Sequence, residues 1–352
     1  MVDLSPSEPM PRPANRPASE HTRRLGSALR QWAARGVGVV RVLDRHGFGT
    51  VEPGQLLAGN AEGETAGRLL LGALDPVAVP LAREAAPGRP RVADAHVTEP
   101  DAVAAGLACA GGATLLGHAL PAELAEALGA ALAEGRPAAL ASTADGTAHL
   151  VLTGAELTEA HGGLGTEAAD GAAGEAARQL LRRGATSTER LTAEGVDLLL
   201  DLWVPVPTLL VVGSGAIGGA LLAQAELLGW AGRAVTELAE ARTALAGFTE
   251  ADVLVLLDHA PAFDALLLDG ITGGRGFIGA LGSRRTQAAR RERLLAAGLS
   301  ERELARLHGP VGLDLGARTA AETAVSVVAE VIAERAGRTG SALAGAAGRI
   351  GA

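Results

Sequence analysis

A glycine-rich turn is the first feature of the sequence that could do chemistry. Gly213, Gly215 and Gly218 fit the spacing G-x-G-x-x-G, directly after the apolar run 208–212 and before a helical stretch. In this motif the first glycine makes a tight turn, the second lets a pyrophosphate approach the backbone, and the third allows close helix–strand packing. The turn predicts a nucleotide-like anion at a helix N-terminus. The alternative is a turn kept for packing alone.

Two further side chains follow at positions typical of such a site. Glu237 lies roughly 20 residues beyond the turn, where dinucleotide-binding domains place the acid that holds a ribose. His259 follows Asp258 at the end of the apolar run 253–257. Ligands of parallel α/β sheets bind at the carboxyl ends of the strands, so we expect both residues there.

An arginine-rich segment, 276–286, offers a second anion site. Ser283 is placed to cap a helix N-terminus, where free N–H groups and the guanidinium groups of Arg284 and Arg285 could converge on one anion. The helix that follows carries three more arginines, and a solvated helix face is the alternative interpretation.

The order of these motifs predicts the architecture that positions them. Strand, glycine turn and helix alternate after residue 205, which predicts a Rossmann-like parallel sheet over 205–337. Prolines just before it suggest a linker after an N-terminal α/β domain at 25–200. Residues 1–24 and 338–352 are expected to be a disordered arm and a flexible tail.

Three segments together resemble a known family. G-S-R-R-T ends at Thr286, L-H-G-P-V-G-L-D-L-G-A-R-T spans 307–319, and A-V-S-V-V-A-E spans 324–330. In this order they are similar to the C-terminal half of the xanthine dehydrogenase accessory factor family (XdhC/CoxI), across roughly 205–337.

The resemblance implies a function and partners. Members of the family are implicated in maturing molybdenum hydroxylases: they bind molybdenum cofactor and support its sulfuration and its insertion into the apoenzyme. The resemblance implies that the partner is the apoenzyme of a molybdenum hydroxylase of the xanthine dehydrogenase or CO dehydrogenase type. A cysteine desulfurase and a second copy of the chain are further possible partners. The cofactor, with its pterin and phosphate, suits Arg284 and Arg285 as anion donors. The expected binding place is near the domain interface.

Several residues of these segments have two interpretations. His308 could act in acid–base chemistry or bind a ligand, or it could hold the Gly-Pro turn that follows it. Asp314 is expected to fix its loop, or to orient Arg284 if it is buried. Glu322 forms a capping box with Thr319 and is therefore expected to be a cap rather than a catalyst.

The helix that this capping box begins is expected to run to about Gly337. Its apolar residues should pack on the sheet as one stripe: Val325, Val328, Val331 and Ile332.

The N-terminal half resembles the family less closely. Segment 106–112 is similar to the family's G-L-x-C-G-G signature, with Cys109 at the cysteine and Ala110 in place of a glycine. The other signature is eroded at 67–75, where Ala73 stands at the family's cysteine and Asp75 at its acid. Cys109 is thus expected to supply a cofactor-binding thiolate near a helix N-terminus. A small buried core residue is the alternative.

Composition excludes several classes of protein. The 352 residues contain no lysine and no tyrosine, so a Schiff-base lysine and a Tyr/Lys proton relay are excluded. A net charge of −9 argues against nucleic acid as a partner, and one cysteine excludes cysteine-rich metal sites. We expect no metal site, no membrane span and no signal peptide, hence a cytoplasmic protein.

Three functions compete on these observations. The first is an accessory protein or chaperone that carries molybdenum cofactor without turnover chemistry of its own. The second is an NAD(P)-dependent oxidoreductase, which the glycine turn and Glu237 favour and in which His259 or His308 would serve hydride transfer. The third is an inert interaction paralogue that binds neither ligand.

Overall fold

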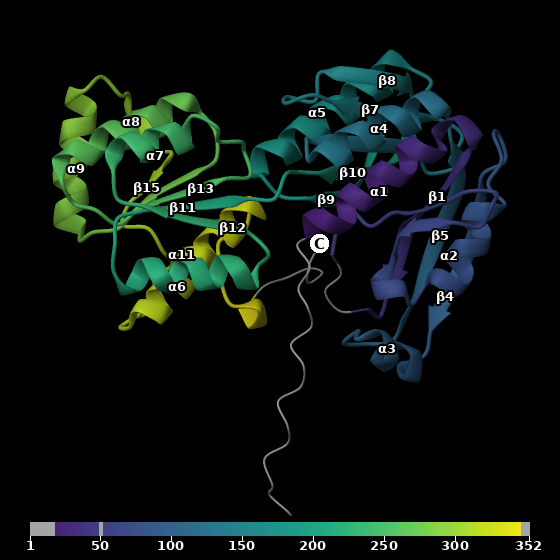
Figure 1. Cartoon of the computed structure of the whole chain (residues 1–352), viewed down its shortest axis with the longest axis horizontal. Helices are drawn as coiled ribbons and strands as arrows, with labels where there is room; N and C mark the ends of the chain where they lie inside the picture. The colour runs from purple at the N-terminus through teal and green to yellow at the C-terminus, as the bar shows by residue number, and fades with distance from the viewer. Residues whose placement is uncertain (1–17, 49–51, 346–352) are drawn as a thin grey trace, which may run out of the picture.

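Three five-stranded sheets make up the computed structural model, which describes residues 18–48 and 52–345. Figure 1 shows two lobes: the N-terminal lobe holds two antiparallel sheets, and the C-terminal lobe holds a parallel sheet with helices on both faces. The Rossmann-like domain and the additional N-terminal α/β region are therefore confirmed. No helix in the described part of the chain is long and apolar enough to span a membrane.

The first sheet has the order β3-β2-β1-β5-β4 and packs against α1 and α2. Neighbouring residues of β1, such as Val39 and Val40, are both fully buried, because α1 packs on one face of this sheet and α2 packs on the other. The elements of this part are α1 (Ala18–Trp32), η1 (Ala33–Arg35), β1 (Val37–His46), β2 (Leu57–Gly59), β3 (Thr65–Gly67), η2 (Leu70–Gly72), α2 (Asp75–Arg83), β4 (Arg91–Val97), α3 (Glu99–Ala105) and β5 (Gly111–Leu120).

The second sheet has the order β8-β7-β6-β10-β9 and packs against α4 and α5. A fully buried arginine, Arg41 of β1, joins it to the first sheet through Asp201 at 2.6 Å and Ser142 at 2.6 Å. The elements are α4 (Ala122–Glu134), β6 (Ala138–Thr143), β7 (His149–Thr153), β8 (Glu159–Gly163), α5 (Glu167–Arg183), β9 (Ser187–Ala193) and β10 (Val196–Trp203).

The parallel sheet has the order β12-β11-β13-β14-β15, which is the doubly wound order 2-1-3-4-5. Apolar residues on one sheet face pack with α7, α8 and α9, and those on the other pack with α6 and α11. The elements are β11 (Thr208–Val212), α6 (Ala216–Leu227), β12 (Ala231–Val235), α7 (Leu238–Leu245), β13 (Val253–Leu256), η3 (Pro261–Phe263), α8 (Asp264–Gly273), β14 (Phe277–Ala280), α9 (Arg284–Ala296), α10 (Glu301–Leu304), β15 (Leu307–His308), α11 (Ala320–Arg335) and η4 (Leu343–Gly345).

Two expectations about boundaries are corrected. Residues 18–24 belong to α1 and are not part of a disordered arm, because Leu25 and Leu29 of this helix pack into the core against α4. The rest of the expected arm, 1–17, lies outside the described residues, as does 346–352 of the expected tail. The change from antiparallel to parallel sheet falls between Trp203 and Thr208.

The amino edge of the parallel sheet faces the N-terminal lobe. Arg275, just before β14, pairs with Glu156 of that lobe at 2.6 Å. Gly184 approaches so closely that an added Cβ would lie 2.2 Å from the carbonyl oxygen of Glu250, before β13. Since all five strands are parallel, their carboxyl edge points away from the N-terminal lobe (Figure 1).

Candidate functional site

The glycine turn lies at the carboxyl edge of β11, as its sequence predicts. Gly213 has a φ of +119° and lies against β13, where an added Cβ would come within 3.1 Å of Leu257 Cβ. Gly218 is close to Leu257 and Val211, so it serves helix–strand packing. Gly215 is the N-cap of α6, has a φ of +116°, and faces open space. Only a glycine fits this conformation, and the free N–H groups of the first turn of α6 are exposed beside it.

A hollow of about 280 Å³ adjoins this turn, and it includes Thr236 and Glu240 in its lining. Glu237 is not among the lining residues: it is the exposed N-cap residue of α7. The Glu240 carboxylate is held by Arg233 at 2.8 Å. The acid that lines the hollow beside the glycine turn is therefore Glu240, and contact of Glu237 with a ligand stays a prediction.

The arginine segment begins α9 at the same edge of the sheet. Ser283 is the N-cap, and its Oγ accepts a hydrogen bond from Thr286 N at 3.2 Å, as expected. Arg284 and Arg285 are exposed, and neither side chain has a hydrogen bond or ion pair within residues 18–48 and 52–345. Two unpaired guanidinium groups at a capped helix N-terminus form a surface that favours an anion.

Arg290, nearly two turns into α9, is fully buried rather than solvated. It donates to Asp264 at 3.0 Å, to the Asp258 carbonyl at 3.0 Å and to the Leu281 carbonyl at 3.4 Å. It thus ties together the loops that follow β13 and β14. The sequence did not indicate this role, because the partners of Arg290 lie in segments far from it in the chain.

His308 is tied to α11. Its Nδ1 lies 2.9 Å from Glu330 Oε1, and its ring stacks on Phe277 at 4.1 Å. Burial acts to raise the pKa of Glu330, but hydrogen bonds from His308 and from Gly312 N outweigh it and lower that pKa. Of the two interpretations of His308, these contacts favour the one in which it holds the loop after it.

The polar residues of segment 324–330 explain why that segment accompanies the loop. Ser326 Oγ donates to the Leu313 carbonyl at 2.5 Å, and Glu330 accepts from Gly312 N. An added Cβ on Gly312, whose φ is +116°, would lie 2.5 Å from Ser326 Oγ. One face of α11 therefore fixes the loop, whereas the sequence pattern predicted only an apolar stripe on this helix.

The expected stripe on α11 is only half right. Val328 and Val331 are buried, whereas Val325 and Ile332 are 45 % and 46 % exposed. The capping box is confirmed: Thr319 Oγ1 accepts from Glu322 N, and the Glu322 carboxylate accepts from Thr319 N. These backbone hydrogen bonds, with one from Arg318 N, lower the pKa of Glu322.

Two expected site residues lie at the surface. Asp314 is exposed and makes no hydrogen bond within the described ranges, so it does not fix its loop and is not buried beside Arg284. His259 is exposed next to Asp258, whose carboxylate accepts from Ala260 N at 2.7 Å. His259 is at the carboxyl edge, as expected, and its contact with a ligand stays a prediction.

Cys109 lies in the loop between α3 and β5 and is exposed, which excludes the buried core residue. The helix end before it is the C-terminal end of α3, capped by Gly106, and not the N-terminus expected to favour a thiolate. Ala73, Leu107 and Ala110 pack on one apolar cluster, so the two signature segments are neighbours. Burial raises the pKa of Asp75, and its Oδ1 has no partner among the described residues.

The structure therefore separates the predicted site into two parts. The glycine turn, His259, Ser283, Arg284 and Arg285 gather at the carboxyl edge of the parallel sheet. Cys109 belongs to the other lobe, next to α3, and Figure 1 draws α3 and α9 at opposite ends of the molecule. One chain cannot bring Cys109 and the two arginines to the same small ligand. The expectation of a site near the domain interface is wrong for the arginine loop.

Fold and site define a doubly wound domain whose carboxyl edge suits an anion. Residues 209–331 match the family model described as the XdhC Rossmann domain, so this part of the chain is similar to that domain. The chain is also similar in fold to a crystal structure from Bacillus halodurans whose title calls that protein a xanthine dehydrogenase. Identity is 17 %, the match covers 90 % of this chain and 98 % of that one, and the TM-score is 0.52. A search among curated proteins found no significant match.

Proposed function

We propose that the protein is an accessory factor that carries molybdenum cofactor as cargo and assists its sulfuration or its insertion into a molybdenum hydroxylase of the xanthine dehydrogenase or CO dehydrogenase type. One observation carries the proposal: in the part of the chain that matches the XdhC Rossmann domain model, two arginines without a partner among the described residues begin a capped helix at the carboxyl edge of the sheet. The fold similarity to a structure titled as a xanthine dehydrogenase agrees with a partner of that type.

The carboxyl edge fits the phosphate of this cargo. The guanidinium groups of Arg284 and Arg285 have no partner in the described part of the chain, and Gly215 leaves open the backbone at the start of α6. Arg290 holds the two intervening loops in place, so the edge is preorganised before a ligand arrives. We infer that this edge holds the anionic end of the cargo.

Cys109 has a separate place in this proposal. Its exposed thiol can contact the sulfur-bearing side of the cargo, or a cysteine desulfurase, only in a different encounter or in a second copy of the chain. The carboxyl edge is therefore the holding site in our proposal, and Cys109 is a transfer or docking site.

The test is anaerobic purification of the full chain from an extract rich in the cofactor. Retained cargo is measured as fluorescence of the oxidised pterin, together with metal analysis for molybdenum. We expect pterin and molybdenum to co-purify with the protein. Pterin at the level of a matched unrelated protein would contradict the proposal.

A second candidate is binding of NAD(P), as in an oxidoreductase. The observation that favours it is the open glycine turn at the switch point between β11 and β13, where doubly wound sheets of this strand order bind ligands. Quenching of NADH fluorescence, followed by assays with an alcohol or an aldehyde, separates the candidates. Binding without turnover fits an accessory factor, and turnover fits the enzyme.

A further inference from the structure

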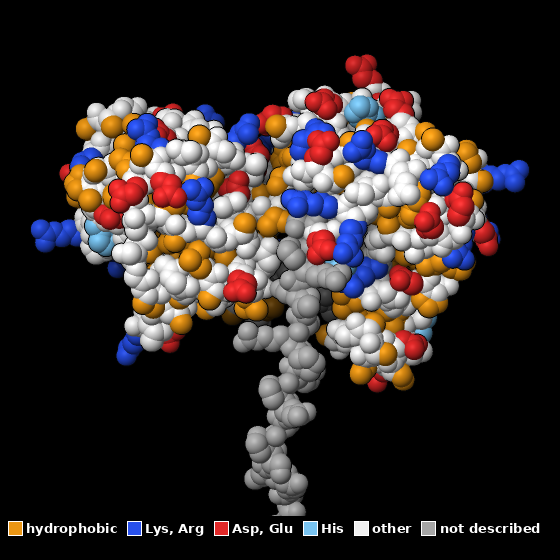
Figure 2. Space-filling model, viewed as in Figure 1, with side chains coloured by type: hydrophobic (Ala, Val, Ile, Leu, Met, Phe, Trp, Pro, Cys, Tyr) orange, Lys and Arg blue, Asp and Glu red, His pale blue; other side chains and the backbone are white. Residues whose placement is uncertain are grey.

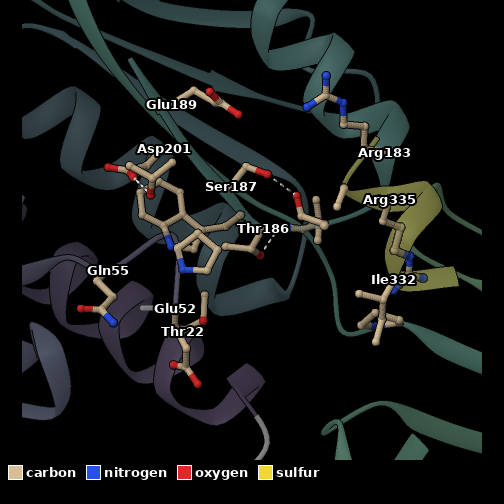
Figure 3. Close-up of a pocket in the computed structure, with 18 of the residues that line it drawn as sticks. Thr22, Glu52, Gln55, Arg183, Thr186, Ser187, Glu189, Asp201, Ile332 and Arg335 are labelled. Atoms are coloured by element: carbon tan, nitrogen blue, oxygen red, sulfur yellow. Dashed lines mark hydrogen bonds between the residues drawn. The ribbon is translucent and has the colours of Figure 1, made fainter. Parts of the chain in front are cut away.

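A large groove lies between the lobes, on the opposite side of the parallel sheet from the carboxyl edge. Its volume is about 1930 Å³, which exceeds the ~300–1,000 Å³ of small-molecule sites. Figure 3 shows Thr22, Gln55 and Asp201 of the N-terminal lobe facing Ile332 and Arg335 of α11. A groove of this size suits a segment of polypeptide better than a cofactor.

One wall of the groove is the free edge of a sheet. β9 is the last strand of the second sheet and pairs only with β10 within the described residues. The consecutive residues 183–190 all line the groove, and 187–190 of them belong to β9. Because successive side chains of a strand point to opposite faces, an unbroken run of lining residues means that the edge itself faces the cavity. Among the described residues no other strand pairs with that edge, so its backbone groups can accept one.

The groove is basic on an acidic protein. Its lining contains seven arginines and five carboxylates, whereas the chain as a whole has a net charge of −9. Asp201 is already neutralised by buried Arg41. Arg23, Arg183 and Arg190 make no ion pair within residues 18–48 and 52–345. Figure 2 shows blue side chains beside the hollow between the lobes.

A further cation is partly buried in the opposite wall. Burial lowers the pKa of Arg335 to about 10, and its guanidinium contacts the Ala251 carbonyl and lies 4.6 Å from the Trp230 ring centroid. Beside it, Ile332 and Leu343 are 46 % and 65 % exposed. The wall opposite β9 therefore combines apolar contact with positive charge.

We propose that this groove binds an extended, acidic segment of a partner protein, which adds as a strand to β9. Backbone hydrogen bonds to the edge of β9 would supply affinity. Carboxylates on alternate residues of the segment would pair with Arg183 and Arg190. The inference is independent of what the carboxyl edge holds, because the two sites lie at opposite edges of the parallel sheet.

The probe is a labelled short peptide that alternates threonine with glutamate, titrated into the full chain and followed by fluorescence anisotropy. We expect it to bind roughly tenfold more tightly than the same peptide with lysine in place of glutamate, and more weakly as salt rises. N-methylation of alternate amides should abolish binding. Equal affinity for the acidic and basic peptides would overturn the proposal.

Variants locate the contact. Arg183→Glu with Arg190→Glu should weaken binding of the acidic peptide roughly tenfold, whereas Arg302→Glu, at an exposed arginine of α10 outside the groove, should not. Because these side chains are exposed, the variants should fold, which thermal unfolding checks. Equal binding by all three proteins would overturn the assignment of the groove.

Hydrogen exchange of the β9 amides tests whether the peptide adds as a strand. The amides of β9 that do not pair with β10 should exchange rapidly in the free protein and become protected when the acidic peptide binds. Binding without new protection would contradict strand addition. Protection already present in the free chain means that the chain's own segment occupies the edge, and protection that grows with protein concentration means a second copy. Either result would overturn a foreign partner.

Discussion

Among the described residues, each lobe contains one fully buried arginine, and the partners of the two arginines differ in kind. Arg41 joins two sheets through Asp201, Ser142 and two strand carbonyls. Arg290 joins two loops and a helix at the carboxyl edge. Arg41 therefore stabilises the packing of the two sheets, whereas Arg290 stabilises the loops at the carboxyl edge. We conclude that the buried arginine of the C-terminal lobe positions the loops of the carboxyl edge, whereas that of the N-terminal lobe holds two sheets together.

Substitution of these arginines should give the largest effects. Arg41→Met leaves the buried Asp201 carboxylate without its cation and should lower the free energy of unfolding by about 3–5 kcal/mol. Arg290→Met should cost less, because Arg293 still contacts Asp264 at 2.5 Å. Urea unfolding of both variants measures the difference, with Arg302→Met as the exposed control. A larger loss for Arg290→Met would reverse the comparison.

The N-terminal lobe should also be the more sensitive to acid. Burial, with the Arg41 cation nearby, lowers the pKa of His149 to about 4, and burial lowers that of the stacked His118 as well. The unfolded chain therefore binds more protons than the folded one as pH falls from 6.5 towards 4. For His149 alone the stability should drop by about 3 kcal/mol over that window.

Unfolding free energies at several pH values test this expectation. His149→Gln should flatten the dependence, and exposed His259→Gln should leave it unchanged. An unaltered slope in His149→Gln would show that the buried histidine pair does not carry the acid sensitivity.

At the carboxyl edge, substitutions should change the affinity for an anion. Arg284→Ala and Arg285→Ala each remove a charge-assisted contact worth ~1.5–3 kcal/mol, so pyrophosphate should bind about tenfold to a hundredfold more weakly to each. Calorimetric titration measures the change, with Arg302→Ala as the matched exposed arginine. Unchanged affinity in a folded double variant would make the two arginines a solvated helix face.

Two glycines at the start of α6 should differ in how their substitution changes the stability of the protein, and this is the smallest expected effect. Gly215→Ala places a side chain at a φ of +116° and should cost about 1–3 kcal/mol. Gly219→Ala, one turn further along α6 with open space around it, should instead stabilise by ~0.5–1 kcal/mol. Thermal unfolding distinguishes them, and equal effects would mean that Gly215 is not required by its conformation.

The sequence predicted the C-terminal site well where local rules apply. The glycine turn, the Ser283 cap and the Glu322 capping box depend on a few adjacent residues, and the structure has all three. It could not predict the burial of Arg290 or the pairing of His308 with Glu330, since these contacts join segments far apart in the chain. The separation of Cys109 from the arginines depends on which sheet edge faces the other lobe, and no local pattern encodes that.

The central claim is that the carboxyl edge, and not Cys109, holds the cargo. It is tested most directly by anaerobic purification of three proteins from one cofactor-rich extract: the unaltered chain, the double variant Arg284→Ala/Arg285→Ala, and Cys109→Ser. Pterin per mole of protein is measured for each. We predict that the arginine double variant loses most of its pterin and that Cys109→Ser retains it. Loss in Cys109→Ser with full retention in the double variant would contradict the account.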